Sequence, residues 1–160
     1  MNREQPHIVI LPEDDANRQI ANGFLTHLNV KYRSVRILPL AGGCKKTADK
    51  FEKELIPLMM QYREMTVILL IDGDQKESEA NNYSYAVAKV PNNLKNRVFI
   101  LGVFSEPEEL KKEIGSYEII GEKLADDCYD NTDTLWGHSL LVHNKSELER
   151  MAFVIKPIIF

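Results

Sequence analysis

Short, mostly apolar runs alternate along the chain with longer segments whose apolar side chains recur at helical spacing. Apolar runs of this kind are typical of strands that are buried on both faces of a parallel sheet. They predict four strands, at residues 7–12, 34–40, 66–71 and 97–103. The helical spacing predicts helices at 13–28, 45–62 and 83–89. This alternation favours an α/β fold with a mostly parallel sheet of about four strands flanked by helices.

The pattern is weaker after Ser105. We expect two short helices (106–114 and 117–125), a loop of solvated acids (126–134), further helical structure (135–150) and a terminal strand or extended tail (153–160). The chain length fits a single domain over 1–160. In this interpretation, residues 7–112 form the core and residues 113–160 form an α-rich extension packed on it.

The composition is that of an ordinary globular protein, with 44% hydrophobic and 28% charged residues. No apolar run approaches the roughly 20 residues of a membrane span, and the N-terminus has no apolar signal core. We therefore expect a cytoplasmic protein that does not insert into a membrane. Cys44 and Cys128 are far apart in sequence, which is more typical of free thiols than of a zinc site or a disulfide.

The net charge of −4 argues mildly against a surface that binds nucleic acid throughout. It does not exclude a metal-dependent enzyme that acts on phosphodiesters. In such a site carboxylates hold the cations, and the cations face the phosphate.

Acidic residues follow two of the predicted strands. Glu13 comes after the first strand, and Asp72 and Asp74 come after the third. Ligands of parallel α/β sheets collect beyond the carboxyl ends of the strands, and residues two apart in an extended segment point to the same side. If the first and third strands are neighbours, the three carboxylates form the oxygen-rich site that Mg²⁺ or Mn²⁺ requires.

Each acid also has a purely structural interpretation. Asp is common where a strand meets solvent, because it favours turns. The run Glu13-Asp14-Asp15 is also what a helix N-terminus favours. The functional interpretation rests on the acids occurring together at the ends of two strands.

Three motifs, in this order, resemble the Toprim domain, most closely that of the nucleases of the overcoming-lysogenization-defect family. They are the strand and acids of 10–15, the glycine turn and helix start of 38–45, and the Asp-x-Asp strand of 68–74. The likeness covers about residues 7–112. This chain departs from the family in having Asp14 where glycine usually follows the first glutamate. It also contains no P-loop motif, so an ATP-driven partner would be a separate protein.

The resemblance implies a Mg²⁺- or Mn²⁺-dependent nuclease acting on DNA or RNA, in genome maintenance or phage defence. The catalytic residues would be Glu13, Asp72 and Asp74. The implied metal ligands are Glu13, Asp14, Asp72, Asp74 and Glu106, the last standing in for the family's acid after the fourth strand.

The alignment at that acid is loose, and Glu109 is the alternative to Glu106. We further interpret the glycine turn and the helix after it as a phosphate contact. The residues of this contact are Gly42, Gly43, Lys45 and Lys46. The sequence leaves open whether the chain forms a homodimer.

Two other functions stay open. A Toprim-like domain with a degenerate site would be a non-catalytic binding subunit. A phospho-receiver would use Asp14 and Asp15 as its acid pair, Asp72 as the phosphorylated residue and Lys156 as its lysine. The gap between Asp15 and Asp72 is longer than receivers normally have, which argues against this alternative.

His138 and His143 lie close in sequence to the only tryptophan, Trp136. They could add a base or a ligand near the acids. The alternative, which we favour, is that Trp136, Leu140 and Leu141 pack on the sheet while the histidines stay at its rim.

Overall fold

The structure, a computed structural model, describes residues 1–73 and 82–160. Strands and helices alternate up to residue 101, and the described residues after that form helices and turns. The strands are β1 (His7–Pro12), β2 (Val35–Ile37), β3 (Met65–Leu70) and β4 (Val98–Leu101). The helices are α1 (Asp15–Leu25), α2 (Cys44–Lys50), α3 (Ile56–Gln61), α4 (Asn82–Ala88), α5 (Pro107–Ile114), α6 (Tyr117–Asp130) and α7 (Lys145–Ile159). Within these described ranges, no helix combines the length and apolar character needed to cross a membrane.

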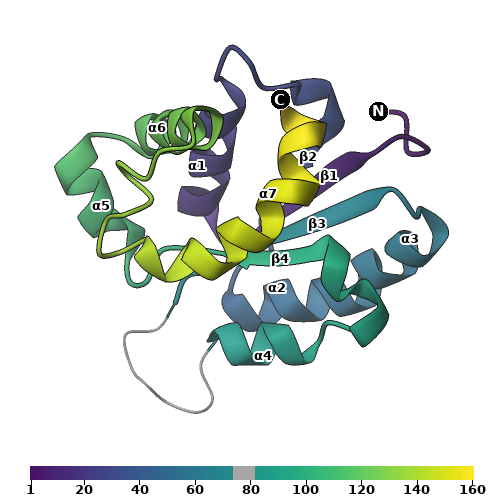
Figure 1. The fold of residues 1–160 in the computed structure, drawn as a ribbon. Helices are drawn as coiled ribbons and strands as arrows, with labels where there is room; N and C mark the ends of the chain where they lie inside the picture. The colour runs from purple at the N-terminus through teal and green to yellow at the C-terminus, as the bar shows by residue number, and fades with distance from the viewer. Residues whose placement is uncertain (74–81) are drawn as a thin grey trace.

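The four strands form one sheet in the order β2-β1-β3-β4, and all described pairs are parallel. In the central pair, Leu11 lies opposite Leu69 and Pro12 opposite Leu70. Every residue of β1 is buried, because helices cover both faces of the sheet (Figure 1). This arrangement confirms the predicted α/β class, and the adjacent β1 and β3 meet the condition under which Glu13 and Asp72 come together.

One face of the sheet packs against a continuous helical segment made of α2, a π-helical segment (Phe51–Leu55) and α3. Phe51, Leu55 and Met59 of this segment are buried against Val9 and Leu11 of β1 and their neighbours. The helical spacing in the sequence predicts Phe51, Leu55, Leu58 and Met59 as the inner stripe of this helix. This is confirmed, although Leu58 is only partly buried against the same cluster. The helix α4 lies on the same side of the sheet (Figure 1).

Side-chain packing of Ile8, Ile10, Ile68 and Phe99 covers the opposite face, against α1 and α7. The predicted first helix is shorter than expected, since α1 ends at Leu25 and Leu28 is 98% exposed. Thr26 and His27 donate their amides to carbonyls of the last turn, so the helix closes before Leu28.

The helices α1 and α6 cross with their backbones in close contact. Gly121 of α6 lies so near α1 that an added Cβ atom would be 2.0 Å from the Ile20 carbonyl oxygen. At Gly23 of α1, an added Cβ would be 2.1 Å from the Glu118 carbonyl oxygen. Glycine at both positions therefore allows this crossing. It fixes α6, and the cluster of Tyr117 and its neighbours, beside the sheet.

Residues 153–159 are helical, so the prediction of a terminal strand or extended tail at 153–160 is wrong. They complete α7, whose Met151, Ile155 and Ile159 pack on the sheet. Pro157 lies inside the helix. A proline there leaves the carbonyl four residues earlier without an amide donor. That residue is Phe153, which is 89% exposed and open to water.

Side chains at the start of α7 bond to the outer edge of β4. Glu147 accepts the Ile100 amide (2.8 Å), and Asn144 bonds to both the amide and the carbonyl of Gly102. Arg150 donates to the Val98 carbonyl and forms an ion pair with Glu147. Unpaired edge groups invite pairing with another chain, and α7 satisfies them.

The predicted loop at 126–134 is wrong for its first five residues, which form the last turn of α6. Asp127 was expected to be solvated but is only 4% exposed. Its carboxylate accepts hydrogen bonds from the Thr132 hydroxyl and from the amides of Thr134, Leu135 and Trp136. Asp127 thus acts as the organising group of the turn after α6.

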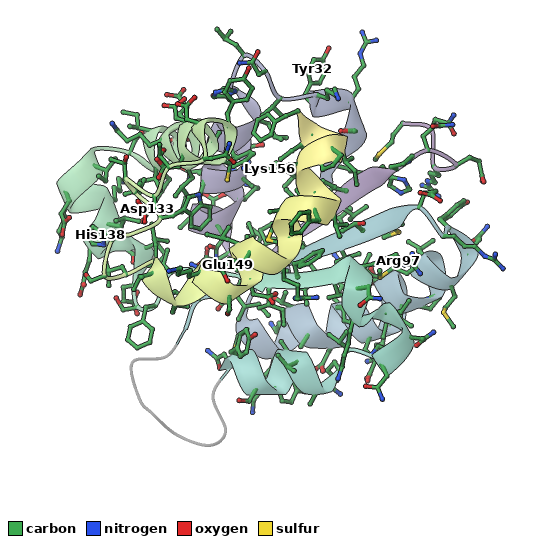
Figure 2. The ribbon with its side chains drawn as sticks, viewed as in Figure 1. Tyr32, Arg97, Asp133, His138, Glu149 and Lys156 are labelled. Atoms are coloured by element: carbon green, nitrogen blue, oxygen red, sulfur yellow. The ribbon has the colours of Figure 1, made fainter. Side chains whose placement is uncertain are left out.

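Arg97, labelled in Figure 2, lies directly before β4 and binds the end of the segment that leads into β3. Its guanidinium donates to the carbonyls of Met59, Tyr62, Arg63 and Met65. A cation is favourable at a helix C-terminus, where carbonyls lack partners. Arg97 therefore fixes the α3–β3 connection to the sheet.

Candidate active site at the carboxyl edge of the sheet

Parallel pairing continues past the ends of the strands and brings the predicted acids together. The Glu13 amide donates to the Leu70 carbonyl (3.0 Å), which extends the β1–β3 pairing by one residue. The Ile71 and Gly73 amides donate to Leu101 and Val103, which extends the β3–β4 pairing. Glu13 and Asp72 therefore leave adjacent strands at the same edge of the sheet.

Glu13 and Asp72 are in direct contact. The Asp72 amide donates to Oε2 of Glu13 at 2.9 Å. The Asp72 carboxylate accepts the Val103 amide on Oδ1 (3.1 Å) and the Asn17 side-chain amide on Oδ2 (3.2 Å). Glu13 follows β1 and Asp72 follows β3. Two hydrogen-bond donors, Asn17 of α1 and Val103 after β4, hold the Asp72 carboxylate in place.

Close packing at Gly102 makes the Val103 contact with Asp72 possible. A Cβ atom at residue 102 would lie 1.9 Å from the Ile71 carbonyl oxygen. With glycine there, the segment after β4 comes close enough for the Val103 amide to reach Asp72.

Both carboxylates are perturbed by their surroundings. Burial raises the pKa of Asp72 to about 8, and the charges of Glu13 and Asp14 add to this, against the hydrogen bonds from Val103 and Asn17. Burial also raises the pKa of Glu13, with smaller contributions from Asp14 and Glu106, while the Asp72 amide lowers it. The pair therefore holds a second negative charge poorly unless a cation compensates it.

Asp14 lies next to this pair but already serves α1. It is the N-cap residue, and its Oδ1 accepts the Asn17 amide (3.0 Å). Its charge still raises the pKa of Glu13 and of Asp72. Asp15 instead points to the exposed surface and pairs with Arg18 (2.6 Å).

Glu106, the acid predicted after the fourth strand, is exposed at the start of α5. Its charge raises the pKa of Glu13, which places it within electrostatic reach of the pair. Asp74 lies outside the described residues. Within residues 1–73 and 82–160, no three His, Cys, Asp or Glu side chains form a ready metal-ligand group.

The glycine turn after β2 wraps around Glu13. The amides of Gly42 and Gly43 donate to the Glu13 carbonyl at 2.8 and 3.3 Å, and the Ala41 amide donates to Pro12. Here these two amides position Glu13. The candidates for phosphate contact at this turn are then the lysines that follow, Lys45 and Lys46.

Both lysines are exposed in the first turn of α2. The Lys45 ammonium lies 5.7 Å from the centre of the Tyr85 ring, and the Tyr85 hydroxyl donates to Asp49.

Three residues of this edge were not predicted from the sequence. Asn17 is buried and bonds to Asp72 through its side chain. Cys44 is close enough to Glu13 for that charge, together with burial, to raise the pKa of its thiol. Tyr117 has a pKa raised by burial and by the charges of Glu108, Asp14 and Asp72. Asn17, three residues after Asp14, is the only one with a local signal, since it lies in the first turn of the predicted helix.

Lys156, the lysine that a phospho-receiver would use, bonds to a residue outside the acidic group. Lys156, labelled in Figure 2, extends from α7 and donates to Asn131 at the end of α6. Asp15 is paired with Arg18 rather than with Asp72. The cluster that a phospho-receiver needs is therefore not made by Lys156 and Asp15 in this structure.

The histidines after the tryptophan also have other partners. His138 lies 2.8 Å from a Glu113 oxygen, and the His143 ring packs 5.5 Å from the Phe104 ring. Leu135 and Leu141 are buried with Val103, and Trp136 packs against them.

No protein-family model, curated protein or solved structure matches this chain. The resemblance to the Toprim domain therefore rests on the order of the three motifs within residues 7–112. Since a fold of this class supports many activities, function has to be argued from the site itself.

Proposed function

We propose that this chain is a Mg²⁺- or Mn²⁺-dependent nuclease whose acidic edge hydrolyses phosphodiester bonds of DNA or RNA. The observation that carries the proposal is the Glu13–Asp72 pair, two partly buried carboxylates joined through the Asp72 amide. Hard oxygen donors with excess negative charge are what a divalent cation of this kind binds. Burial, with a smaller contribution from the charges of Glu13 and Asp14, raises the pKa of Asp72 to about 8, so its ionised form would be favoured by a bound cation.

The proposal gives each residue of the edge a role. Glu13 and Asp72 would hold the cation, with Asp74 as a third ligand. Asn17 and the Val103 amide orient Asp72, as partners beyond the ligands do in metal sites. When bound, the cation supplies positive charge to the scissile phosphate and a water of lowered pKa.

Further acids and lysines would complete the site. Asp14 and Glu106 would add negative charge around a second cation, and Lys45 and Lys46 would contact the nucleic-acid backbone. The resemblance also suggests action with a separate ATPase in genome maintenance or phage defence, and the proposal places the protein in the cytoplasm.

The test is cleavage of supercoiled plasmid, single-stranded DNA and RNA with Mg²⁺ or Mn²⁺. We expect Glu13→Gln and Asp72→Asn to reduce cleavage at least about 100-fold, because each removes a ligand charge. Asp15→Asn is the matched control, since this acid is adjacent in sequence but exposed and paired with Arg18. Cleavage that survives chelation of the metal, or that is equal in Asp72→Asn and wild type, would refute the nuclease.

A second candidate is a non-catalytic binding subunit with a degenerate Toprim-like site. The observation that favours it is that no ready group of three metal-binding side chains occurs within the described ranges. Calorimetry with Mg²⁺ and Mn²⁺ separates the two candidates. A chain that binds neither ion and cuts no substrate is the binding subunit.

A further inference from the structure

A cavity of about 130 Å³ lies on the face of the sheet that α1, α6 and α7 cover. Its walls include Ile8, Ile10, Ile68, Phe24, Leu124 and Ile155. Protein interiors are close-packed, with few voids larger than a water molecule. An apolar cavity of about 150 Å³ in another protein stays dry and binds benzene. The space here is therefore of ligand size.

The chemistry of the lining is uneven. Nearly all of it is apolar, and its described residues include one lysine, Lys156, and no carboxylate. Lys156 is half-buried, and its ammonium reaches from α7 to the Asn131 side chain at the end of α6. Figure 2 shows Lys156 between α7 and the α1–α6 pair. An apolar volume with a single cation suits an amphiphile whose head is an anion.

We propose that this cavity binds a short aliphatic carboxylate, with a chain of about six to eight carbons in the apolar space and its carboxylate on Lys156. The chain length follows from the volume, which is close to that of the benzene-binding cavity. The Lys156 ammonium exchanges its contact with the neutral Asn131 amide for a charge-assisted bond. This proposal does not depend on the nuclease.

The cavity also adjoins the acidic edge. Asn17 lines the cavity and donates to Asp72, and Val103 lines it and donates to the other oxygen of Asp72. A bound chain would therefore contact both residues that orient this carboxylate.

The test uses the fluorescence of Trp136, the only tryptophan, which lines the cavity. The full chain is titrated with octanoate and, separately, with 1-octanol, with calorimetry as a second readout. We expect a saturable change with octanoate. Lys156→Met should weaken octanoate at least about tenfold and leave 1-octanol unchanged, because it removes only the charge. Ala152→Leu, which fills the cavity, should abolish both.

Phe153→Ser is the matched surface control, because Phe153 is exposed on the same helix. Loss of binding in this variant would show adsorption to the surface and would overturn the proposal. So would the absence of a saturable signal and of heat with octanoate. Binding that is lost in Ala152→Leu but unchanged in Lys156→Met would overturn the carboxylate in favour of a neutral ligand.

A measurement on the wild-type chain covers the case in which Ala152→Leu does not fold. Cys128 also lines the cavity, whereas Cys44 lies near Glu13. Octanoate should slow alkylation of Cys128 and leave that of Cys44 unchanged, as read by mass spectrometry. Equal rates for Cys128 with and without octanoate would contradict the proposal.

Discussion

The surroundings of Asp72 disfavour its charged form, and this lowers the stability of the fold. Burial and the neighbouring acids Glu13 and Asp14 raise its pKa to about 8. A carboxyl group with a raised pKa favours folding in its protonated form, so its contribution is complete at acidic pH and is lost as the pH rises from about 4 to about 8. The same charge that suits a cation thus weakens the fold without one.

We predict that Asp72→Asn stabilises the chain at pH 9 by about 1–3 kcal/mol, because the neutral amide does not carry a buried charge. Asn17 can turn its own amide to keep the hydrogen bond. The difference from wild type should shrink toward pH 4. Urea unfolding at both pH values measures this, and a variant less stable than wild type at pH 9 would contradict it.

Asp127 is the opposite case, an acid that stabilises the fold as a carboxylate. Burial raises its pKa, but the hydrogen bonds from Thr132, Leu135, Trp136 and Thr134 outweigh burial, and the pKa is lowered. A lowered pKa means that the stabilisation is present above about pH 4 and is lost as the pH falls through the folded-state pKa.

We predict that Asp127→Asn lowers the free energy of unfolding by about 2–4 kcal/mol at pH 7, because its amide group would face backbone donors. The loss should shrink as the pH falls below about 4, because the stabilisation disappears as the pH passes through the lowered folded-state pKa of the wild-type carboxyl group. Asp130→Asn, at the exposed end of the same helix, is the control. Equal destabilisation by both variants would assign the effect to the helix end rather than to the hydrogen bonds.

At the scale of single residues, the sequence predicts what lies directly after a strand and little else. The sequence could place Glu13 and Asp72 together because the carboxyl ends of neighbouring parallel strands lie at the same edge of a sheet. Asn17 could not be predicted as their partner, because its contact with Asp72 depends on how α1 leans on the sheet. Cys44 likewise comes near Glu13 only because the turn at Gly42 and Gly43 bonds to the Glu13 carbonyl.

Among the elements, the α1–α6 crossing depends on glycine. Alanine within a helix is normally favourable over glycine by about 0.5–1 kcal/mol. At Gly121 the added methyl group would meet the Ile20 carbonyl.

We predict that Gly121→Ala destabilises the chain by about 1–3 kcal/mol, because the helices must move apart. Thermal unfolding measures this. Lys123→Ala, two residues further along α6 and exposed, is the control and should be near neutral. A Gly121→Ala variant that unfolds at a higher temperature than wild type would show that the crossing adjusts without cost.

The elements that could be predicted from the sequence are those in which consecutive residues are apolar and buried. β1, β3 and β4 are short, mostly apolar and buried runs with helices on both sides. The second half of the last helix was missed because Pro157 and the apolar residues around it are typical of an extended segment. Phe153, four positions before the proline, lies at the surface, where water can bond to its unpaired carbonyl. The proline is tolerated here for that reason, which depends on the tertiary structure.

For the whole molecule, α6 and α7 are part of the main core. Ile8, Ile10, Ile68 and Phe99 of the sheet are covered by α7 and α1, and α6 covers α1 in turn. A fragment that ends at residue 112 would lose α7 and leave the part of this face that α7 covers open to water.

We therefore predict that the fragment 1–112 does not unfold cooperatively and forms aggregates, because a large apolar face and a strand edge are exposed. Circular dichroism during heating and size-exclusion chromatography measure these two properties. The full chain with Phe153→Ser should behave as a single cooperative species. A sharp melting transition in the fragment would show instead that residues 7–112 fold alone.

The bonds from α7 to the outer edge of β4 have a consequence for synthesis on the ribosome. The last strand ends at Leu101 and α7 begins at Lys145, so 43 residues separate the edge from the helix that covers it. At about 5–20 residues per second, translation of this interval takes roughly 2–9 s. During that time the growing chain presents an open strand to its neighbours on the same messenger, and a slow stretch of codons there would lengthen the exposure.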